Sequence, residues 1–233
     1  MIGFEPRKNN SMLRTQDGWI GEYKKKNALW IHDGNPKRPH ALLTSGMHSN
    51  GFFNSRLVIP DEILLRDAAS DLLELFARQG GDVSKINGVV GPQTGATKLA
   101  ELLSDQISAF NRDDCFWASP AKHDDGGRKT MVFDRQELDT LRGQYVLVCE
   151  DVLTTGGSVD LTTDAIDDAG SASAPFILAL VNRSGLTHIG NRAIIALINH
   201  HMPIWTPDEC LLCKQQSEAL RPKENWDKLN AIC

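Results

Sequence analysis

The strongest periodic pattern of apolar residues in the chain lies between positions 60 and 79. Its apolar side chains recur every three or four residues, which is the spacing of one helix face: Ile63, Leu64, Ala68, Leu72, Leu75 and Phe76. Asp61 stands where an N-cap is expected, and Gly80 and Gly81 follow the last apolar position. The pattern therefore predicts a helix over residues 60–79.

Short apolar runs predict strands along the rest of the chain. They lie at 86–90, 115–118, 145–149, 176–181 and 193–198, and helical patterns occupy 96–107 and 158–169. Residues 120–129 are polar and contain Gly126 and Gly127, so we expect a flexible loop there, followed by a short returning strand at 130–133. Strands that alternate with helices predict an α/β fold with a central, mostly parallel sheet flanked by helices.

Composition places the chain among ordinary globular proteins. Of its 233 residues, 41% are apolar and 24% are charged, and the net charge of −5 gives no electrostatic footprint for nucleic acid. No apolar stretch approaches the ~20 residues that a membrane span needs, and no signal-peptide pattern is evident. Five scattered cysteines do not suggest a disulfide framework, so we expect a cytoplasmic protein with reduced thiols.

The segment richest in candidate chemistry is 145–158, YVLVCEDVLTTGGS. A buried strand is predicted to lead directly into two carboxylates, Glu150 and Asp151, and then into a small-residue turn that opens a helix. Adjacent carboxylates repel each other unless ribose hydroxyls or a hydrated Mg²⁺ satisfy them. The glycines and the helix N-terminus can direct several N–H groups at one phosphate. An ordinary N-cap with a glycine turn, and a solvated pair of surface acids, remain open as alternatives.

Common nucleotide-binding motifs do not fit the chain. There is no G-x-x-x-x-G-K-[ST], which GPQTGATK at 91–98 resembles only superficially, and no G-x-G-x-x-G follows a predicted strand. GPQTG at 91–95 and NRSG at 182–185 do follow predicted strands, however. Ligands bind at the carboxyl edge of parallel sheets, so we expect these loops to share one rim with the acidic segment.

The ordered set of motifs resembles the type I phosphoribosyltransferases, which bind 5-phosphoribosyl 1-diphosphate (PRPP). CEDVLTTGGS at 149–158 is similar to their signature of apolar residues, two acids and a phosphate loop. Four further segments resemble orotate phosphoribosyltransferases, in family order: LLTSGMHSNGFFNSR (42–56), GPQTGATKLA (91–100), PAKHDDGG (120–127) and NRSG (182–185). The resemblance implies the type I phosphoribosyltransferase fold with a small N-terminal hood lobe.

This resemblance implies roles for the residues that contact PRPP. Glu150 and Asp151 would hold the ribose 2- and 3-hydroxyls, and Lys122 on a mobile catalytic loop would neutralise the departing diphosphate. The loop that cradles the 5-phosphate would comprise Thr154, Thr155, Gly156, Gly157 and Ser158. The residues that approach the diphosphate with backbone groups would be Gln93, Thr94 and Gly95.

The resemblance also implies a base site, a division of the chain and a reaction. Arg183 would sit near the pyrimidine with Phe52 and Phe53 beside it. Residues 1–60 would form the N-terminal segment and hood, residues 61–205 the core, and residues 206–233 a C-terminal segment packed on the core. The reaction would transfer phosphoribosyl from PRPP to orotate in de novo pyrimidine biosynthesis. It would use Mg²⁺ bound mainly through the sugar diphosphate, with no protein metal site, and the enzyme would be a homodimer.

Several positions depart from the family pattern. Ala118 and Ser119 stand where the family usually carries an Arg-Lys pair, and Thr44 stands where lysine often precedes the SG motif. The loop histidine, His123, directly follows Lys122, which is not its usual place. His123, Arg128 or Lys129 would have to compensate for the missing cations. Three alternatives therefore stay open: a phosphoribosyltransferase for another base, a catalytically weak regulator that binds PRPP, and a generic nucleotide-binding domain.

Cys210 and Cys213 form a CxxC pair, with His200 and His201 upstream. A zinc site needs about four ligands, but adjacent histidines rarely point the same way. We therefore expect a reduced structural pair here, and we expect His40 and His48 to be ordinary surface or core histidines.

Overall fold

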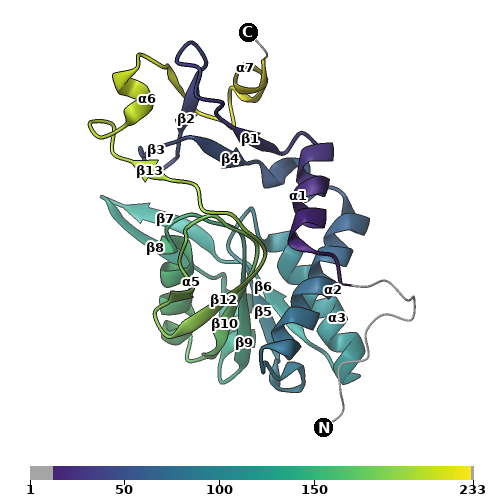
Figure 1. The fold of residues 1–233 in the computed structure, drawn as a ribbon. Helices are drawn as coiled ribbons and strands as arrows, with labels where there is room; N and C mark the ends of the chain where they lie inside the picture. The colour runs from purple at the N-terminus through teal and green to yellow at the C-terminus, as the bar shows by residue number, and fades with distance from the viewer. Residues whose placement is uncertain (1–12, 232–233) are drawn as a thin grey trace.

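A computed structural model of the protein describes residues 13–231 (Figure 1). The start of the expected N-terminal segment, residues 1–12, lies outside the described residues. No helix of the described part combines the length and the apolar character that a membrane crossing requires.

The core is built on a six-stranded sheet with the order β11-β12-β10-β9-β5-β6. All neighbouring strands are parallel except β11, which runs antiparallel to β12. The strands are β5 (Gly88–Val90), β6 (Phe116–Ala118), β9 (Tyr145–Leu153), β10 (Ala172–Asn182), β11 (His188–Ile189) and β12 (Arg192–Asn199). The prediction of a mostly parallel sheet flanked by helices is therefore confirmed.

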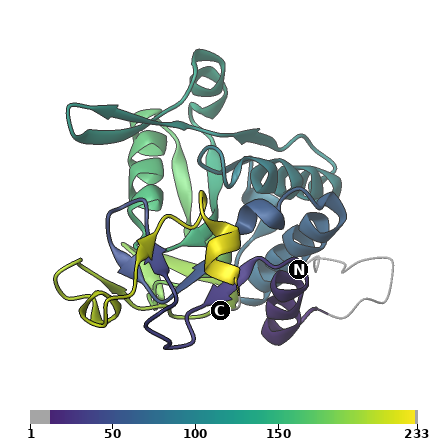
Figure 2. The same cartoon turned by 90° about the horizontal axis from the view of Figure 1, so that it is seen from above.

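Helices cover both faces of this sheet (Figure 2). On β9, Leu147 and Cys149 belong to the cluster that includes the helices α1, α2 and α3, whereas Val146 and Val148 belong to the cluster that includes α5. This alternation is the period-2 pattern of a strand buried on both sides. The helices are α1 (Gln16–Lys25), α2 (Glu62–Arg78), α3 (Thr97–Asn111), α4 (Arg135–Leu141) and α5 (Gly157–Asp168), with 3-10 turns at Ser55–Leu57 and Val83–Lys85.

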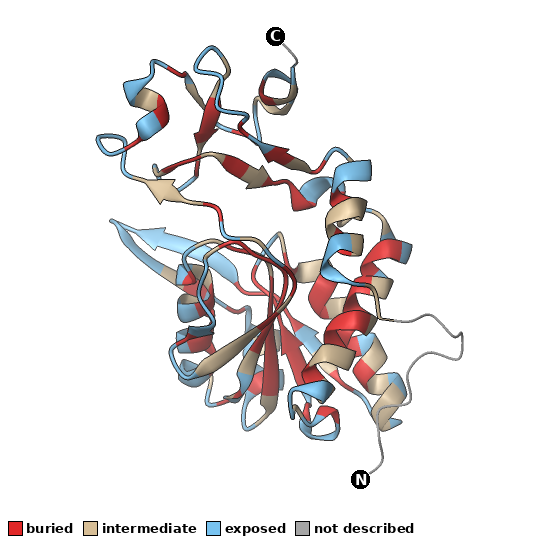
Figure 3. Ribbon diagram, viewed as in Figure 1, coloured by how far each residue is buried: buried red, intermediate tan, exposed pale blue. Residues whose placement is uncertain are grey.

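Helix α2 follows the sequence pattern closely. Asp61 caps it by accepting a hydrogen bond from the Leu64 N–H at 3.0 Å, and its apolar face is buried, as the red side of the helix in Figure 3 shows. Leu65, Leu72 and Leu73 are each fully buried there. Each such side chain contributes about 1.5–3 kcal/mol to folding by leaving water.

Two elements differ from the expectation. The acidic pair lies within β9, which continues to Leu153, instead of following the strand. The expected flexible loop at 120–129 is wrong: this segment forms a hairpin of β7 (Ala121–Asp125) and β8 (Arg128–Val132). Gly126 and Gly127 adopt φ of +59° and +96°, which makes the tight hairpin turn possible, and ladder hydrogen bonds then order the polar strands.

The hood consists of two small sheets above the carboxyl edge of the core sheet (Figure 1). One pairs β1 (Leu29–Ile31) with β4 (Gly51–Phe53), and the other has the order β13-β3-β2-β14. The strands of the second sheet are β2 (His40–Leu42), β3 (His48–Ser49), β13 (Ile204–Trp205) and β14 (Ala219–Leu220).

The C-terminal segment also contains α6 (Leu211–Lys214) and α7 (Trp226–Asn230). We expected this segment to pack on the core, whereas the contacts found here join it to the hood. Strand β14 pairs with β2, and Leu229 is buried in a cluster with Trp30 and Leu43. The hood is therefore assembled from strands between residues 29 and 53 together with the C-terminal segment from residue 204 onward.

Candidate functional site

The side chains of the acidic pair leave β9 on opposite faces, because successive side chains of a strand alternate. Their carboxyl groups nevertheless lie within hydrogen-bonding reach of each other. Asp151 lies on the α3 face against the loop 91–95: a Cβ atom added at Gly95 would sit 2.7 Å from its Oδ2. Glu150 lies on the α5 face and is only 7% exposed. The two carboxyl groups therefore meet at the sheet edge, and Asp151 lies beside the loop 91–95.

Burial raises the pKa of Glu150 well above its usual range, and the neighbouring charge of Asp151 raises this pKa further. Lys122 acts in the opposite direction, so its ammonium group lies within electrostatic reach of Glu150. A buried carboxylate beside a second acid is typical of a functional site, because such a pair is costly without a ligand.

The predicted phosphate loop leads directly into α5. Gly156 is the N-cap residue with φ +88°, a left-handed conformation that strongly favours glycine, and no side chain caps the helix. The first N–H groups of a helix lack partners within the helix, so this end is open to an anion. Thr155 and Gly157 are exposed beside it, and Thr154 and Ser158 are half-buried.

The predicted diphosphate loop is held by Ser119, a residue that sequence reasoning treated only as a missing cation. The Ser119 hydroxyl donates to the Gly91 carbonyl at 2.7 Å and lies 2.6 Å from the Thr97 hydroxyl. Gln93 donates from Nε2 to the Ser119 carbonyl at 2.9 Å, and its peptide bond to Thr94 is cis. Gln93 and Thr94 are exposed at the tip of the loop.

Ala118 and Ser119 are 1% and 2% exposed. A lysine or arginine at either position would bury its charge, so the two departures from the family pattern fit this local packing. Of these two residues, Ser119 could have been noticed in the sequence as a small polar residue at the end of a predicted strand. Its hydrogen-bond partners could not be read from the sequence.

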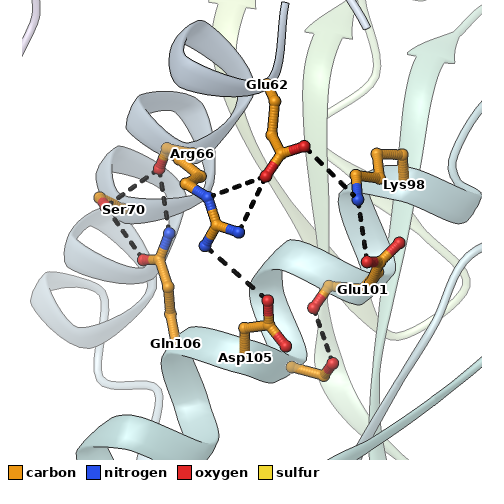
Figure 4. Close-up of polar contacts among 8 residues, drawn as sticks. Glu62, Arg66, Ser70, Lys98, Glu101, Asp105 and Gln106 are labelled. Carbon is orange, nitrogen blue, oxygen red and sulfur yellow. Dashed lines mark hydrogen bonds and ion pairs between the residues drawn. The ribbon is translucent and has the colours of Figure 1, made fainter. Parts of the chain in front are cut away.

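Lys98, the cation that follows the diphosphate loop, is paired with acids of α2 and α3 (Figure 4). Its ammonium group lies 2.8 Å from Glu101 and 3.9 Å from Glu62, within an ion-pair network between α2 and α3. The superficial likeness of GPQTGATK to a P-loop is therefore not accompanied by a lysine aimed at a phosphate.

Lys122 is exposed on β7, opposite Met131. The other cations of the hairpin have acidic neighbours: Lys129 stands opposite Asp124, and Arg128 stands opposite Asp125. Directly opposed residues of antiparallel strands lie within reach of each other, so these two charges are offset locally.

Arg183 connects the core to the hood. It follows β10 directly, is 2% exposed, and donates from Nη1 to the Gly51 carbonyl at 2.9 Å and from Nη2 to the Ser49 hydroxyl. Burial lowers its pKa to about 10. Its Nε has no hydrogen-bond partner within the described chain. Arg183 therefore lies at the junction where we expected the base, but its terminal nitrogens already have partners in the hood.

Phe52 and Phe53 do not share one face of β4. Phe53 is 2% exposed and packs edge-on against Tyr23, with ring centroids 5.3 Å apart, whereas Phe52 packs against Trp226 at 5.9 Å. Strand alternation separates them, so the expectation that both flank a base does not fit their positions.

The CxxC pair has other histidine neighbours than the sequence suggested. His201 is exposed, and His200 packs against Phe53. The side chains that meet Cys210 and Cys213 are those of His40 and His48, from the hood strands. Their spacing along the chain gave no signal of this, because the contacts join histidines to cysteines that are 165 to 173 positions apart.

Comparisons with known proteins agree with this geometry. The phosphoribosyl transferase domain family matches residues 62–200. The orotate phosphoribosyltransferase of Pelotomaculum thermopropionicum is 32% identical over 188 residues, which cover 78% of this chain and 87% of that protein.

The crystal structure of the orotate phosphoribosyltransferase from Aeropyrum pernix superposes with a TM-score of 0.58 at 22% identity, covering 76% of this chain and 91% of that one. An adenine phosphoribosyltransferase from Rhodothermus marinus superposes with a TM-score of 0.54 at 19% identity, covering 78% and 98%. The fold alone is thus shared by enzymes with different bases. Together with the matched domain, these likenesses show that the chain belongs to the phosphoribosyltransferase family that includes the orotate phosphoribosyltransferases.

Proposed function

We propose that the chain is an orotate phosphoribosyltransferase, which transfers the phosphoribosyl group of PRPP to orotate and releases orotidine 5-monophosphate and diphosphate in de novo pyrimidine biosynthesis. The observation that carries this proposal is one sheet edge that holds the acidic pair, the uncapped N-terminus of α5 and the loop 91–95. The similarity to curated proteins named orotate phosphoribosyltransferase, over most of their length, supports orotate as the base.

The proposed site matches the three parts of PRPP. Glu150 and Asp151 would accept hydrogen bonds from the ribose hydroxyls, and the loop from Thr154 to Ser158 would donate N–H groups to the 5-phosphate. Gln93, Thr94 and Gly95 would face the diphosphate with backbone groups. A nitrogen of orotate displaces diphosphate at C1 of the ribose, and positive charge develops on the ring as in glycoside cleavage. No protein nucleophile is needed.

Mg²⁺ fits the donors found at this edge. Half-buried Asp151 and the hydroxyl groups of the phosphate loop offer oxygen ligands, which Mg²⁺ prefers. When bound with the sugar diphosphate, Mg²⁺ would supply positive charge to the leaving group. The chain itself would contribute few direct ligands, since most of the ion's oxygens would come from the substrate and water.

The hairpin β7–β8 would act as a lid. Lys122 would offset the charge of the departing diphosphate, and covering the site would exclude water from the activated sugar. Every residue from Ala121 to Lys129 is exposed, so the hairpin is accessible to a second subunit of the proposed homodimer. Four described cysteines are free thiols, in line with a cytoplasmic location.

On the base side, we propose that Arg183 sets the position of the hood over the pyrimidine through Ser49 and Gly51. Phe52 would then present the only accessible aromatic ring of the pair, and Phe53 would support it from the core.

A direct absorbance assay tests the proposed activity. The purified chain is mixed with Mg²⁺, PRPP and orotate, and the loss of orotate absorbance is followed beside a panel of purine and pyrimidine bases. Turnover of orotate alone supports the proposal. Turnover of another base and not of orotate would assign the chain to that base.

A second candidate function is a regulator that binds PRPP with little catalysis. The observation that favours it is the depletion of cations around the leaving group: Ala118 and Ser119 are buried, and Arg128 and Lys129 face acids across the hairpin. Calorimetric binding of PRPP without turnover of any base would favour this candidate over the enzyme.

A further inference from the structure

Four side chains with metal-binding atoms converge in the hood, and none of them belongs to the proposed site at the sheet edge. His40 comes from β2, His48 from β3, and Cys210 and Cys213 flank the start of α6. One ligand atom from each residue lies within 4.8 Å of the other three. His40 and Cys210 are completely buried, His48 is 6% exposed, and Cys213 is half-buried.

The separations within this cluster are close to those of a tetrahedral metal site. His40 Nε2 lies 3.5 Å from each of the two sulfur atoms, and His48 Nδ1 lies 3.2 Å from the sulfur of Cys213. Zn–N bonds of about 2.0–2.1 Å and Zn–S bonds of about 2.3 Å would place tetrahedral N and S ligands about 3.5 Å apart, and two N ligands about 3.3 Å apart. The two imidazole nitrogens are 2.9 Å apart, so a metal would widen this edge by only about 0.4 Å.

The neighbours of His40 leave its metal-facing nitrogen as an acceptor. The Ser217 hydroxyl donates its hydrogen to the Arg38 carbonyl at 2.6 Å, so it accepts from His40 Nδ1, which lies 2.8 Å away. A neutral His40 therefore carries its hydrogen on Nδ1 and directs the Nε2 lone pair at the cluster. A fixed hydrogen bond on the far nitrogen of an imidazole is the usual support of a metal-binding histidine.

Without a metal, the lone pair on His40 Nε2 can accept a hydrogen bond from only one of the three neighbouring atoms. The Nδ1 of His48 and both sulfur atoms compete for the same position. A divalent ion satisfies all four atoms at once, and two thiolates would neutralise its charge.

The small size of the hood sheet gives such a site a structural role. Its four strands have only two or three residues each, and the apolar cluster of the hood contains four buried side chains: Trp30, Ala41, Leu43 and Leu229. Lobes of this size usually need a metal or a disulfide to be stable. The cluster joins β2 and β3 to residues about 170 positions later, where a crosslink constrains the chain most.

We propose that His40 Nε2, His48 Nδ1 and the thiolates of Cys210 and Cys213 bind one zinc ion that fastens the C-terminal segment to the hood. Four protein ligands leave no open position, so the ion is structural and not catalytic. Two thiolates with two imidazoles in tetrahedral arrangement select zinc among the common divalent ions. This inference does not depend on the proposed activity.

The test measures metal in the full-length wild-type chain purified without chelators. Elemental analysis is expected to find one zinc ion per chain. Exchange with Co²⁺ is expected to give the visible bands of tetrahedral cobalt together with a thiolate-to-cobalt charge-transfer band. The Cys210→Ser/Cys213→Ser variant should lose both signals, whereas Cys115→Ser, which alters a buried thiol outside the cluster, should keep them.

Ser217→Ala provides a variant that keeps all four ligands. Loss of the hydrogen bond to His40 Nδ1 should weaken zinc binding about 10–100-fold, as measured by competition with a chelating dye. Chelation of the wild-type chain should lower its melting temperature and expose two additional thiols to a thiol reagent.

Two results would overturn the proposal. One is a wild-type chain with reduced thiols that neither contains zinc nor gives tetrahedral cobalt bands. The other is a Cys210–Cys213 disulfide in the chain isolated from a reducing cytoplasm, because it would assign the pair to redox chemistry.

Discussion

Replacing both acids of the pair by amides, Glu150→Gln with Asp151→Asn, is expected to weaken PRPP binding and to raise thermal stability at neutral pH. The substitutions keep the size and polarity of the side chains and remove their charge. One variant is therefore expected to lower the affinity for PRPP and at the same time to raise the melting temperature.

The binding loss follows from the hydrogen bonds proposed for the ribose hydroxyls. A hydrogen bond to a charged group is worth about 1.5–3 kcal/mol, so two of them are worth about 3–6 kcal/mol. Because every 1.4 kcal/mol is a factor of ten, PRPP should bind roughly 10²–10⁴-fold more weakly.

The gain in stability follows from the raised pKa of Glu150, which is caused first by burial and then by Asp151. The folded chain holds this proton more tightly than the unfolded chain does, so stability falls as pH rises from the unfolded pKa of about 4.3 towards the folded value. Each pKa unit corresponds to about 1.4 kcal/mol. A gain of only 1 kcal/mol on removal of the charge would raise the melting temperature by about 2–4 °C in a chain of this size.

Calorimetric titration with PRPP and thermal unfolding at pH 4 and pH 7.5 measure the two effects. The melting-temperature gain should be present at pH 7.5 and largely absent at pH 4, where Glu150 is protonated in both states. Asp139→Asn, which removes a charge at an exposed position on α4, should change neither quantity. Unchanged PRPP affinity would refute the assigned sugar site, and a lower melting temperature at pH 7.5 would refute the reasoning about the buried charge.

Three further predictions concern single residues. Lys122→Ala should lower kcat by at least about 10²-fold, the size expected for one transition-state contact, with little change in PRPP affinity. Lys129→Ala in the same hairpin should have a small effect on kcat, and full turnover in Lys122→Ala would show that the role of Lys122 is misassigned. Gly156→Ala should destabilise the fold by more than the ~1–2 kcal/mol of left-handed strain, because the added Cβ would also lie 2.9 Å from the side chain of Ile189. In denaturant unfolding, it should lose more stability than Gly143→Ala, where the glycine has a similar φ of +75° and open space around it. Equal losses of stability in the two variants would contradict the contribution of the isoleucine contact. Ser119→Ala should cost about 1–3 kcal/mol of stability, because the buried Gly91 carbonyl loses its donor, and it should raise the KM for PRPP. An unchanged KM would mean that the diphosphate loop does not need the Ser119 hydroxyl to hold its position.

The sequence alone was sufficient for the elements whose signals are local. The helix at α2 follows from its apolar spacing and its Asp61 cap, and the parallel sheet follows from apolar runs that alternate with helices. The ordered set of motifs that includes Glu150 resembled the phosphoribosyltransferases, and the matched domain shows that family, because each motif is a local pattern that can be read from the sequence.

The sequence indicated only the end of the hairpin at 121–132, as the short strand expected at 130–133. Strand β7 gave no signal, because its residues after Ala121 are all polar or charged and it is ordered by backbone pairing and a two-glycine turn. The extension of β9 through the acidic pair was missed for a similar reason, since polar residues conceal a strand that its neighbours continue to pair.

Side-chain partners across the chain were decided only by the tertiary structure. The sequence supplied the carboxylates, the glycines and the CxxC pair, but the histidines nearest to the cysteines along the chain were His200 and His201. Folding brings His40 and His48 to them instead, turns Ser119 into the anchor of a loop, and separates Phe52 from Phe53 across a strand. The helical or strand repeat of the sequence determines which face of its own element a side chain occupies. Which other side chains that face contacts depends on how elements distant in the sequence pack together.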